Sequence, residues 1–223
     1  MKAGDNLNKK CFVSWSGGKD SCLALYSALE KGYKPEKLLT MFSSENEISS
    51  AHRLNEQIFR KQAESIGIEN VIVRAKFDEY ESSFVNHIKL FKEQGIDYGI
   101  FGDIDLEEHR HWEEMVCEKS SIKAVLPLWK LNRKEIVEKF ITLGFKAKII
   151  VVNTTMLDTK FLGQDLTIPL IKEIESYGAD ACGENGEYHT VVYDGPIFKN
   201  PIELIYNTEI IPVGEKWAQI EIN

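Results

Sequence analysis

The chain has 223 residues, of which 43% are hydrophobic and 28% charged, with a formal net charge of -8 and a pI near 5.3. This length suits one large α/β domain or two unequal lobes, and the composition excludes a mainly disordered chain. The acidic balance argues against a broad nucleic-acid-binding face. Without a signal-like segment or an apolar stretch of membrane-spanning length, we expect a cytoplasmic protein.

The first half alternates short apolar runs with segments of helical periodicity. We expect helices around the apolar stripes of the intervening segments, for example the stripe formed by Cys22, Leu25 and Leu29. Strands separated by helices in this rhythm predict a parallel sheet covered on both faces. The strands are expected at residues 11–15, 38–42, 71–75, 98–102 and 124–126.

The second half begins with the same rhythm, with a helix around residues 136–141 and a strand at 148–152, and then changes character. A helix over 165–177 and strands at 188–193, 202–206 and 217–222 are expected there. The fold is therefore predicted as an α/β parallel-sheet domain over residues 1–126, followed by a smaller α+β domain over residues 127–223.

Four cysteines, Cys11, Cys22, Cys117 and Cys182, are scattered along the chain without a C-x-x-C pair. This spacing gives no sign of a zinc site or a redox pair. We expect free thiols in or near the core.

A glycine-rich loop follows the first predicted strand, with the sequence Ser16-Gly17-Gly18-Lys19-Asp20-Ser21. At a strand-to-helix turn, backbone N–H groups and the positive end of the helix dipole favour an anion. The glycines let the backbone approach a phosphate closely, the serine hydroxyls can donate to its oxygens, and Lys19 adds charge. The loop matches neither a Walker A motif nor a G-x-G-x-x-G fingerprint.

Asp20 is the unusual member of this loop, because a carboxylate repels phosphates unless a divalent cation lies between them. It is interpreted either as a residue that binds Mg²⁺ or as the N-cap of the following helix.

The loop sequence S-G-G-K-D-S resembles the PP-loop of the N-type ATP pyrophosphatases. Further segments resemble the diphthine–ammonia ligase family: Gly102-Asp103-Ile104, Pro127-Leu128-Trp129, the C-terminal motif Cys182-Gly183-Glu184-Asn185-Gly186-Glu187-Tyr188-His189-Thr190, and Asp194-Gly195-Pro196. Together they span nearly the whole chain. Asn185 and His189 depart from the ligases, which carry Gly and Glu there, and in this form the motif is similar to that of bacterial relatives of unassigned substrate.

The resemblance implies an adenine nucleotide alpha hydrolase-like domain that uses ATP and Mg²⁺. It implies adenylation of a substrate carboxylate, release of pyrophosphate, and amidation by ammonia or an amine. The expected residues are Ser16, Gly17, Gly18, Lys19, Asp20, Ser21, Met41, Gly102 and Asp103 for the nucleotide; Lys19, Asp20, Glu187 and His189 for catalysis; Glu184, Asn185, Glu187, His189 and Thr190 for the substrate; and Asp20 for the metal.

The C-terminal motif gathers ionisable groups just before a predicted strand. Asn185-Gly186 alone would also fit a turn decorated by solvated charges. Along a strand, His189 and Thr190 face opposite sides, so both reach one pocket only where the backbone twists or bulges. His189 is the better candidate for proton transfer, because an imidazole titrates near neutrality.

Several further residues have two interpretations. Asp103, at the end of the fourth strand, either faces a ligand or caps the next helix. His109-Arg110-His111 fits a solvated helix face better than a metal site, because alternate residues of a helix do not share a face. His52 and Arg53 are candidates for substrate contact.

We therefore expect an AMP-forming ligase that acts on a small-molecule or protein-borne carboxylate. The chain shows no glutaminase pattern, so ammonium or a separate donor would supply the nitrogen, and a homo-oligomer remains compatible with the sequence. Two alternatives are a nucleotide sensor without turnover and a tRNA-thiolating PP-loop enzyme. The second would need cysteine chemistry and a basic face that the sequence does not offer.

Overall fold

A computed structural model describes residues 9–44, 49, 54–207 and 209–222. His52 and Arg53 lie outside the described residues. The N-terminal part is a five-stranded parallel sheet in the order β3-β2-β1-β4-β5. Its strands are β1 (Lys10–Ser14), β2 (Lys34–Ser43), β3 (Glu69–Ala75), β4 (Tyr98–Ile100) and β5 (Lys123–Val125).

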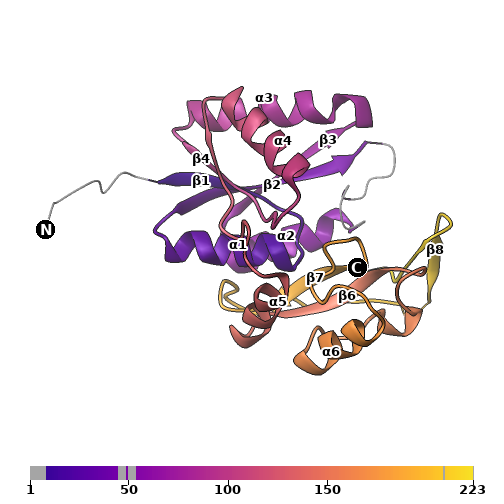
Figure 1. The fold of residues 1–223 in the computed structure, drawn as a ribbon. Helices are drawn as coiled ribbons and strands as arrows, with labels where there is room; N and C mark the ends of the chain where they lie inside the picture. Colours follow the sequence, from indigo (N-terminus) through magenta and orange to yellow (C-terminus); the bar gives the residue numbers. More distant parts are fainter. Residues whose placement is uncertain (1–8, 45–48, 50–53, 208, 223) are drawn as a thin grey trace, which may run out of the picture.

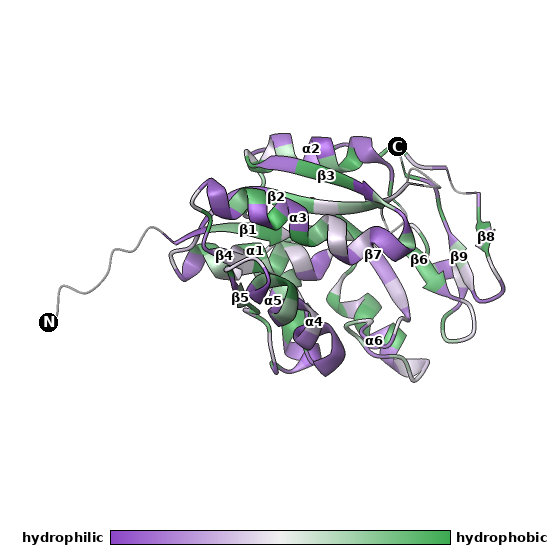
Figure 2. Ribbon diagram, turned by 90° about the horizontal axis from the view of Figure 1, so that it is seen from above, coloured by the Kyte–Doolittle hydropathy of each residue, from purple (hydrophilic) through white to green (hydrophobic). Residues whose placement is uncertain are grey.

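Helices cover both faces of this sheet (Figure 1). One face carries α1 (Lys19–Glu30) and α2 (Glu56–Ile66), and the other carries α3 (Tyr80–Glu93), which follows the 3₁₀ turn η1 (Phe77–Glu79), and α4 (Glu107–Glu118). Successive side chains of a strand point to opposite faces of the sheet, so the sheet contributes to two cores. Val13 belongs to one core and its neighbour Phe12 to the other. Figure 2 shows the result, with mainly hydrophobic central strands and helices that are green on one side and purple on the other.

The C-terminal part is a four-stranded antiparallel sheet in the order β7-β6-β9-β8. Its sheet shares one continuous apolar core with the α1 and α2 face of the first domain. The elements are α5 (Arg133–Thr142), which packs against α1, β6 (Lys146–Asn153), η2 (Thr159–Phe161), α6 (Ile168–Ser176), β7 (Tyr188–Asp194), β8 (Ile211–Val213) and β9 (Trp217–Gln219).

The predicted fold class is confirmed in its architecture: an α/β domain with a parallel sheet precedes a smaller α+β domain. The predicted boundary between residues 126 and 127 falls in the connection between β5 and α5 and stays a prediction. All four cysteines are buried and free, as expected. No helix among the described residues is long and apolar enough to cross a membrane.

One predicted strand is wrong. Residues 202–206 form only an isolated bridge between Tyr206 and Ile222, and β8 is the outer strand instead. The segment lies against the end of α2, where Lys199 N–H donates to Ser65 O (2.9 Å) and Lys61 Nζ donates to Glu203 O (3.4 Å). Strand β8 was not predicted because it contains Pro212. Proline is tolerated in an edge strand, but in a sequence it argues against a strand.

Candidate active site

The glycine-rich loop connects β1 to α1, and Gly18 is the N-cap of the helix. Asp20 is the second residue of the helix, so its interpretation as the N-cap is wrong. Gly17 has φ +72°, a left-handed conformation that favours glycine, and a Cβ there would lie 2.7 Å from Gln62 Oε1. The loop therefore needs glycine at this position for both conformation and space.

Gln62, from α2, holds the loop in place although it is completely buried. Its Nε2 donates to Gly17 O (3.0 Å) and to Val192 O on β7 (2.8 Å), and its Oε1 accepts from Trp15 Nε1 (2.9 Å). A side chain with all of these partners satisfied fixes its neighbours, since each unpaired buried group would cost about 1–3 kcal/mol.

Strand β7 also binds the loop directly. Lys19 N–H donates to Thr190 Oγ1 (3.1 Å), and Val192 N–H donates to Gly17 O (3.0 Å). The start of α1 and the C-terminal motif are therefore fixed against each other, although they are about 170 residues apart in the sequence.

A pocket of about 290 Å³ lies where these segments meet. The loop forms one wall, the end of β4 and the start of α4 form a second, and the C-terminal motif forms a third. Its lining residues are Ser14, Ser16, Lys19, Asp20, Ser21, Gly102, Asp103, Leu106, His109, Gly183, Glu184, Gly186, Tyr188, His189 and Thr190.

A charged cluster lies in the wall of the pocket. Lys19 Nζ lies 2.8 Å from Asp20 Oδ2 and 3.7 Å from Glu184 Oε1, and Lys19 is only 5% exposed. Burial alone would lower the pKa of Lys19, but the charge of Asp20 and its other neighbours raises it well above the usual value. Burial and the charge of Asp20 raise the pKa of Glu184 to about 7. Lys19 therefore stays charged, whereas Glu184 changes charge near neutrality.

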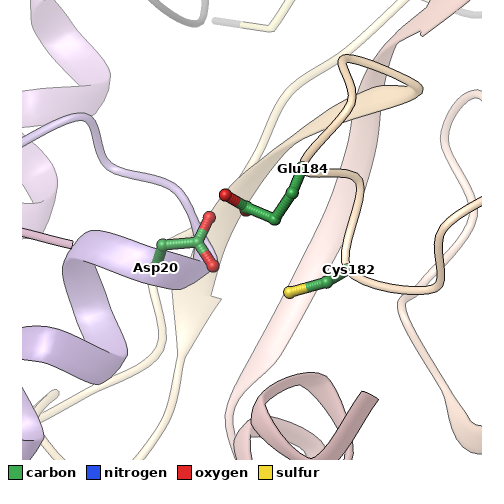
Figure 3. Close-up of side chains that lie close together, drawn as sticks. All are labelled: Asp20, Cys182 and Glu184. Atoms are coloured by element: carbon green, nitrogen blue, oxygen red, sulfur yellow. The ribbon is translucent and has the colours of Figure 1, made fainter. Parts of the chain in front are cut away.

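Figure 3 shows Asp20, Cys182 and Glu184 converging from α1 and from the C-terminal motif. One ligand atom of each lies within 4.8 Å of the others, which makes them a candidate metal-binding group. Asp20 Oδ1 is buried and has no hydrogen-bond partner among the described residues. Burial raises the pKa of the Cys182 thiol, so Cys182 stays protonated and is a poor ligand. The oxygens of Asp20 and Glu184 match the preference of Mg²⁺.

Glu187 is completely buried and accepts hydrogen bonds from the loop that carries Glu184. One carboxylate oxygen accepts from Asp180 N–H (2.9 Å) and Asn185 Nδ2 (3.1 Å), and the other accepts from Asn185 N–H (2.9 Å). Glu187 and Asn185 thus hold the loop and do not line the pocket.

Arg133, the first residue of α5, connects this loop to the first domain. Its guanidinium donates to both carboxylate oxygens of Asp105 (2.7 Å each), and Nη1 donates to Asp180 Oδ2 (2.8 Å) and Asn185 Oδ1 (2.9 Å). Asp180 in turn accepts from Cys182 N–H and Glu184 N–H. The planar guanidinium fork therefore fixes the position of the backbone next to Glu184.

Arg133→Lys is expected to loosen this loop with little loss of global stability. A lysine keeps the positive charge beside Asp105 and Asp180, but it cannot bind both oxygens of Asp105 and also reach Asp180. Hydrogen exchange at the amides of residues 182–185 should accelerate, while the melting temperature falls only slightly. Arg110→Lys, at a surface pair with Glu114, is the control. Equal exchange rates of these amides in both variants would contradict the inference that Arg133 holds the loop in place.

His189 and Thr190 both line the pocket, as the motif requires. The register of β6 and β7 shifts between Ile149 and Val151, opposite these two residues, with the additional residue on β6, so the ladder is irregular where both reach the pocket. The His189 ring stacks on Trp217, with centroids 5.7 Å apart and an interplanar angle of 19°.

Asp103 faces the pocket and also contacts α4. Its Oδ1 accepts a hydrogen bond from His109 Nδ1 (2.7 Å), and Leu106, not Asp103, is the N-cap of α4. The interpretation of Asp103 as a helix cap is therefore wrong. His109 also lines the pocket, although its side chain is 59% exposed, so the expected solvated face of the His109-Arg110-His111 cluster fits both His109 and His111.

Of the other expected nucleotide residues, Gly102 lies in the pocket wall. A Cβ there would lie 3.0 Å from the backbone of Asp20 and Ser21, so the end of β4 packs closely on α1. Gly17 and Gly18 shape the loop without lining the pocket. Met41 is 7% exposed and packs in the core on the α3 and α4 face.

Sequence reasoning missed Gln62, Arg133 and Glu113, a buried residue of α4 whose carboxyl hydrogen bonds to Asp103. A signal existed for Gln62 and Glu113, because each is a polar residue within the apolar stripe of a helix: Gln62 lies beside Phe59 and Ala63, and Glu113 beside Val116 and Cys117. Arg133 follows the N-cap Asn132 and gave no such signal.

The comparisons with known proteins agree with this architecture. The diphthamide synthase N-terminal domain matches residues 9–124 and the diphthamide synthase C-terminal domain matches residues 132–221. The diphthine–ammonia ligase of Homo sapiens is 28% identical over 231 residues, covering 92% of this chain and 86% of that protein. That of Danio rerio is 26% identical over 231 residues, covering 92% and 90%.

A solved structure, described as a predicted subunit of tRNA methyltransferase from Methanocaldococcus jannaschii DSM, has a TM-score of 0.46 and 16% identity, covering 86% of this chain and 100% of that chain. The family models span both domains and include every residue of the pocket wall. The chain belongs to the diphthamide synthase family and is similar to the diphthine–ammonia ligases of Homo sapiens and Danio rerio.

Proposed function

We propose that the protein is an ATP-dependent ligase that adenylates a substrate carboxylate, releases pyrophosphate and then joins the acyl group to ammonia or another amine. The observation that carries this proposal is the meeting of the glycine-rich loop with Glu184 and His189 in one pocket. One wall suits phosphates, and the facing wall offers groups that can bind and deprotonate a nucleophile. The names of the family relatives support the same chemistry.

The loop would bind the phosphates of ATP. Lys19 is held within reach of them by Asp20, and it stays charged. The hydroxyl of Ser21 donates to Gly18 O (3.0 Å), and that of Ser16 donates to Ser21 Oγ (3.2 Å), so both can turn towards a phosphate at little cost. Negative charge grows on the departing pyrophosphate, and a fixed cation next to it lowers the barrier.

Asp20 and Glu184 would hold Mg²⁺. The buried, unpartnered Oδ1 of Asp20 and the nearby carboxylate of Glu184 fit an oxygen-preferring cation. The ion would supply charge that offsets the repulsion between these carboxylates and the phosphates.

The reaction would proceed in two displacements. A carboxylate oxygen of the substrate attacks the α-phosphorus, and the bond to the bridging oxygen of pyrophosphate breaks. The amine nitrogen then attacks the acyl carbon, and AMP leaves. His189, in the wall formed by the C-terminal motif, would accept the proton of the amine. The segment ordered by Glu187 and Asn185 would keep Glu184 facing the substrate. Thr190 would hold the start of α1 in place through Lys19 N–H.

The proposal is tested by incubating the protein with Mg-ATP, ammonium and a panel of carboxylates, including a peptide that carries diphthine, the substrate named for the relatives. AMP and pyrophosphate are the expected products, in amounts that depend on the carboxylate. Formation of ADP would contradict cleavage between the α and β phosphates. Tight binding of AMP without turnover on any carboxylate would favour a nucleotide sensor instead.

A further inference from the structure

Hydrogen bonds connect three polar side chains from the buried face of α4 to the pocket: Glu113, Asp103 and His109. Glu113 is 3% exposed, Asp103 ends β4, and His109 lines the pocket. His109 Nδ1 donates to Asp103 Oδ1 (2.7 Å), and the carboxyl of Glu113 also hydrogen bonds to Asp103. Glu113 Oε2 is buried and meets no other hydrogen-bond partner in the described part of the chain.

Two carboxyl groups this close in a buried place share a proton, because they cannot both be ionised. Burial, the hydrogen bond to Asp103 and the charge of Asp103 raise the pKa of Glu113 to about 11, so Glu113 is the neutral donor. Burial raises the pKa of Asp103, but the hydrogen bonds from His109 and Glu113 outweigh it and hold that pKa below its usual value. Asp103 is therefore the charged acceptor between two donors.

Asp103 fixes the tautomer and orientation of His109. Because Nδ1–H is used by Asp103, Nε2 is the nitrogen left to meet a ligand. The hydrogen bond to Asp103 and the charges of Asp103, Glu184 and Glu108 raise the pKa of His109, which favours its imidazolium form.

Positive charge is scarce in the pocket wall. Among the described residues of its wall, Asp20, Asp103 and Glu184 bring carboxylates, whereas Lys19 is the one lysine or arginine and is already paired with Asp20 and Glu184. Beside Lys19 and the proposed Mg²⁺, an imidazolium at His109 would offset part of the repulsion between these carboxylates and a polyanion.

We propose that His109 binds a phosphate oxygen of the ligand through Nε2, and that Asp103 and the buried Glu113 are the residues that position it. This inference rests on the proposed function, because the loop must first bring phosphates into the pocket. It assigns a binding role to His109 and a positioning role to Glu113.

Calorimetric titration with magnesium pyrophosphate, AMP and ATP tests the assignment. His109→Gln is expected to weaken pyrophosphate and ATP about tenfold, the effect of one charge-assisted hydrogen bond, and to leave AMP almost unchanged if the β and γ phosphates are the partners. If AMP weakens equally, the α-phosphate is the partner. His111→Gln, on the same helix but outside the pocket, is the matched control. Equal affinities for His109→Gln and the native chain would overturn the proposal.

The pH dependence separates charge from packing. The affinity ratio of the native chain to His109→Gln should fall as pH rises from 6 to 9 through the raised pKa of His109. The charged groups around His109, which are Lys19, Asp20, Asp103, Glu108 and Glu184, are present in both proteins. A ratio that stays constant would show that the imidazolium contributes nothing.

Glu113 is tested by two variants of similar volume. Glu113→Leu removes the donor to Asp103 and should weaken pyrophosphate binding severalfold, whereas Glu113→Gln keeps an N–H donor and should recover most of the loss. Equal weakening in both would overturn the positioning role. If the native chain binds neither ATP nor pyrophosphate, the proposed function itself fails, which is distinct from normal native binding that His109→Gln does not change.

Discussion

Asn in place of Asp20 is expected to lower the rate of AMP and pyrophosphate formation at least about 100-fold, the loss typical of removing one electrostatic group from a reacting centre. The substitution keeps the shape of the side chain and removes its charge. An amide cannot act as the anionic oxygen ligand of Mg²⁺, and its NH₂ group would face Lys19 Nζ, which now lies 2.8 Å from Asp20 Oδ2. The rate is measured by release of pyrophosphate at saturating ATP.

The matched control is Asp97→Asn, because Asp97 pairs with Lys92 (2.6 Å) at the opposite end of β4 from Asp103. It should keep the native rate. A circular dichroism melt of both variants shows whether the fold is intact. Native-like turnover in Asp20→Asn would remove Asp20 from the mechanism and with it the proposed Mg²⁺ site.

The fold was predictable as far as local patterns decide it. Each strand of the parallel sheet was expected, because a short apolar run followed by an amphipathic helix has few other solutions. The C-terminal sheet was less predictable. Residues 202–206 have strand-like side chains, yet their place is decided by contacts with α2, more than 130 residues earlier in the chain. Such contacts leave no local trace in the sequence.

The site shows the same division. The composition and position of the glycine-rich loop predicted a phosphate site, whereas the C-terminal motif was predicted as a site mainly from its resemblance to the diphthine–ammonia ligase family. The structure brings most of the residues of both into one pocket. What composition could not show is how they are held together. Thr190 and Gln62 bind the loop through its backbone, and Arg133 spans the two domains. These contacts depend on register and on packing between distant segments, which a single sequence does not contain.

Glu113→Gln is expected to stabilise the protein, by an amount that grows with pH. The unfolded chain ionises Glu113 near the ordinary pKa of 4.5, whereas the folded chain must keep the proton up to about pH 11. The folded state therefore binds more protons over this range, and the stability contributed by Glu113 is lost as pH rises from 4.5 towards 11. At pH 7 the cost is about 3 kcal/mol, since each pH unit above 4.5 costs about 1.4 kcal/mol.

Glutamine avoids this cost, because it donates to Asp103 without carrying a titrating proton. Urea unfolding at pH 5 and pH 8 should therefore show a small difference between Glu113→Gln and the native chain at pH 5 and a difference larger by about 4 kcal/mol at pH 8. Glu114→Gln, whose exposed carboxylate pairs with Arg110, is the control and should show no such growth. A stability difference that is the same at both pH values would mean that the folded pair retains no proton, and Glu113 would then not be the neutral donor to Asp103.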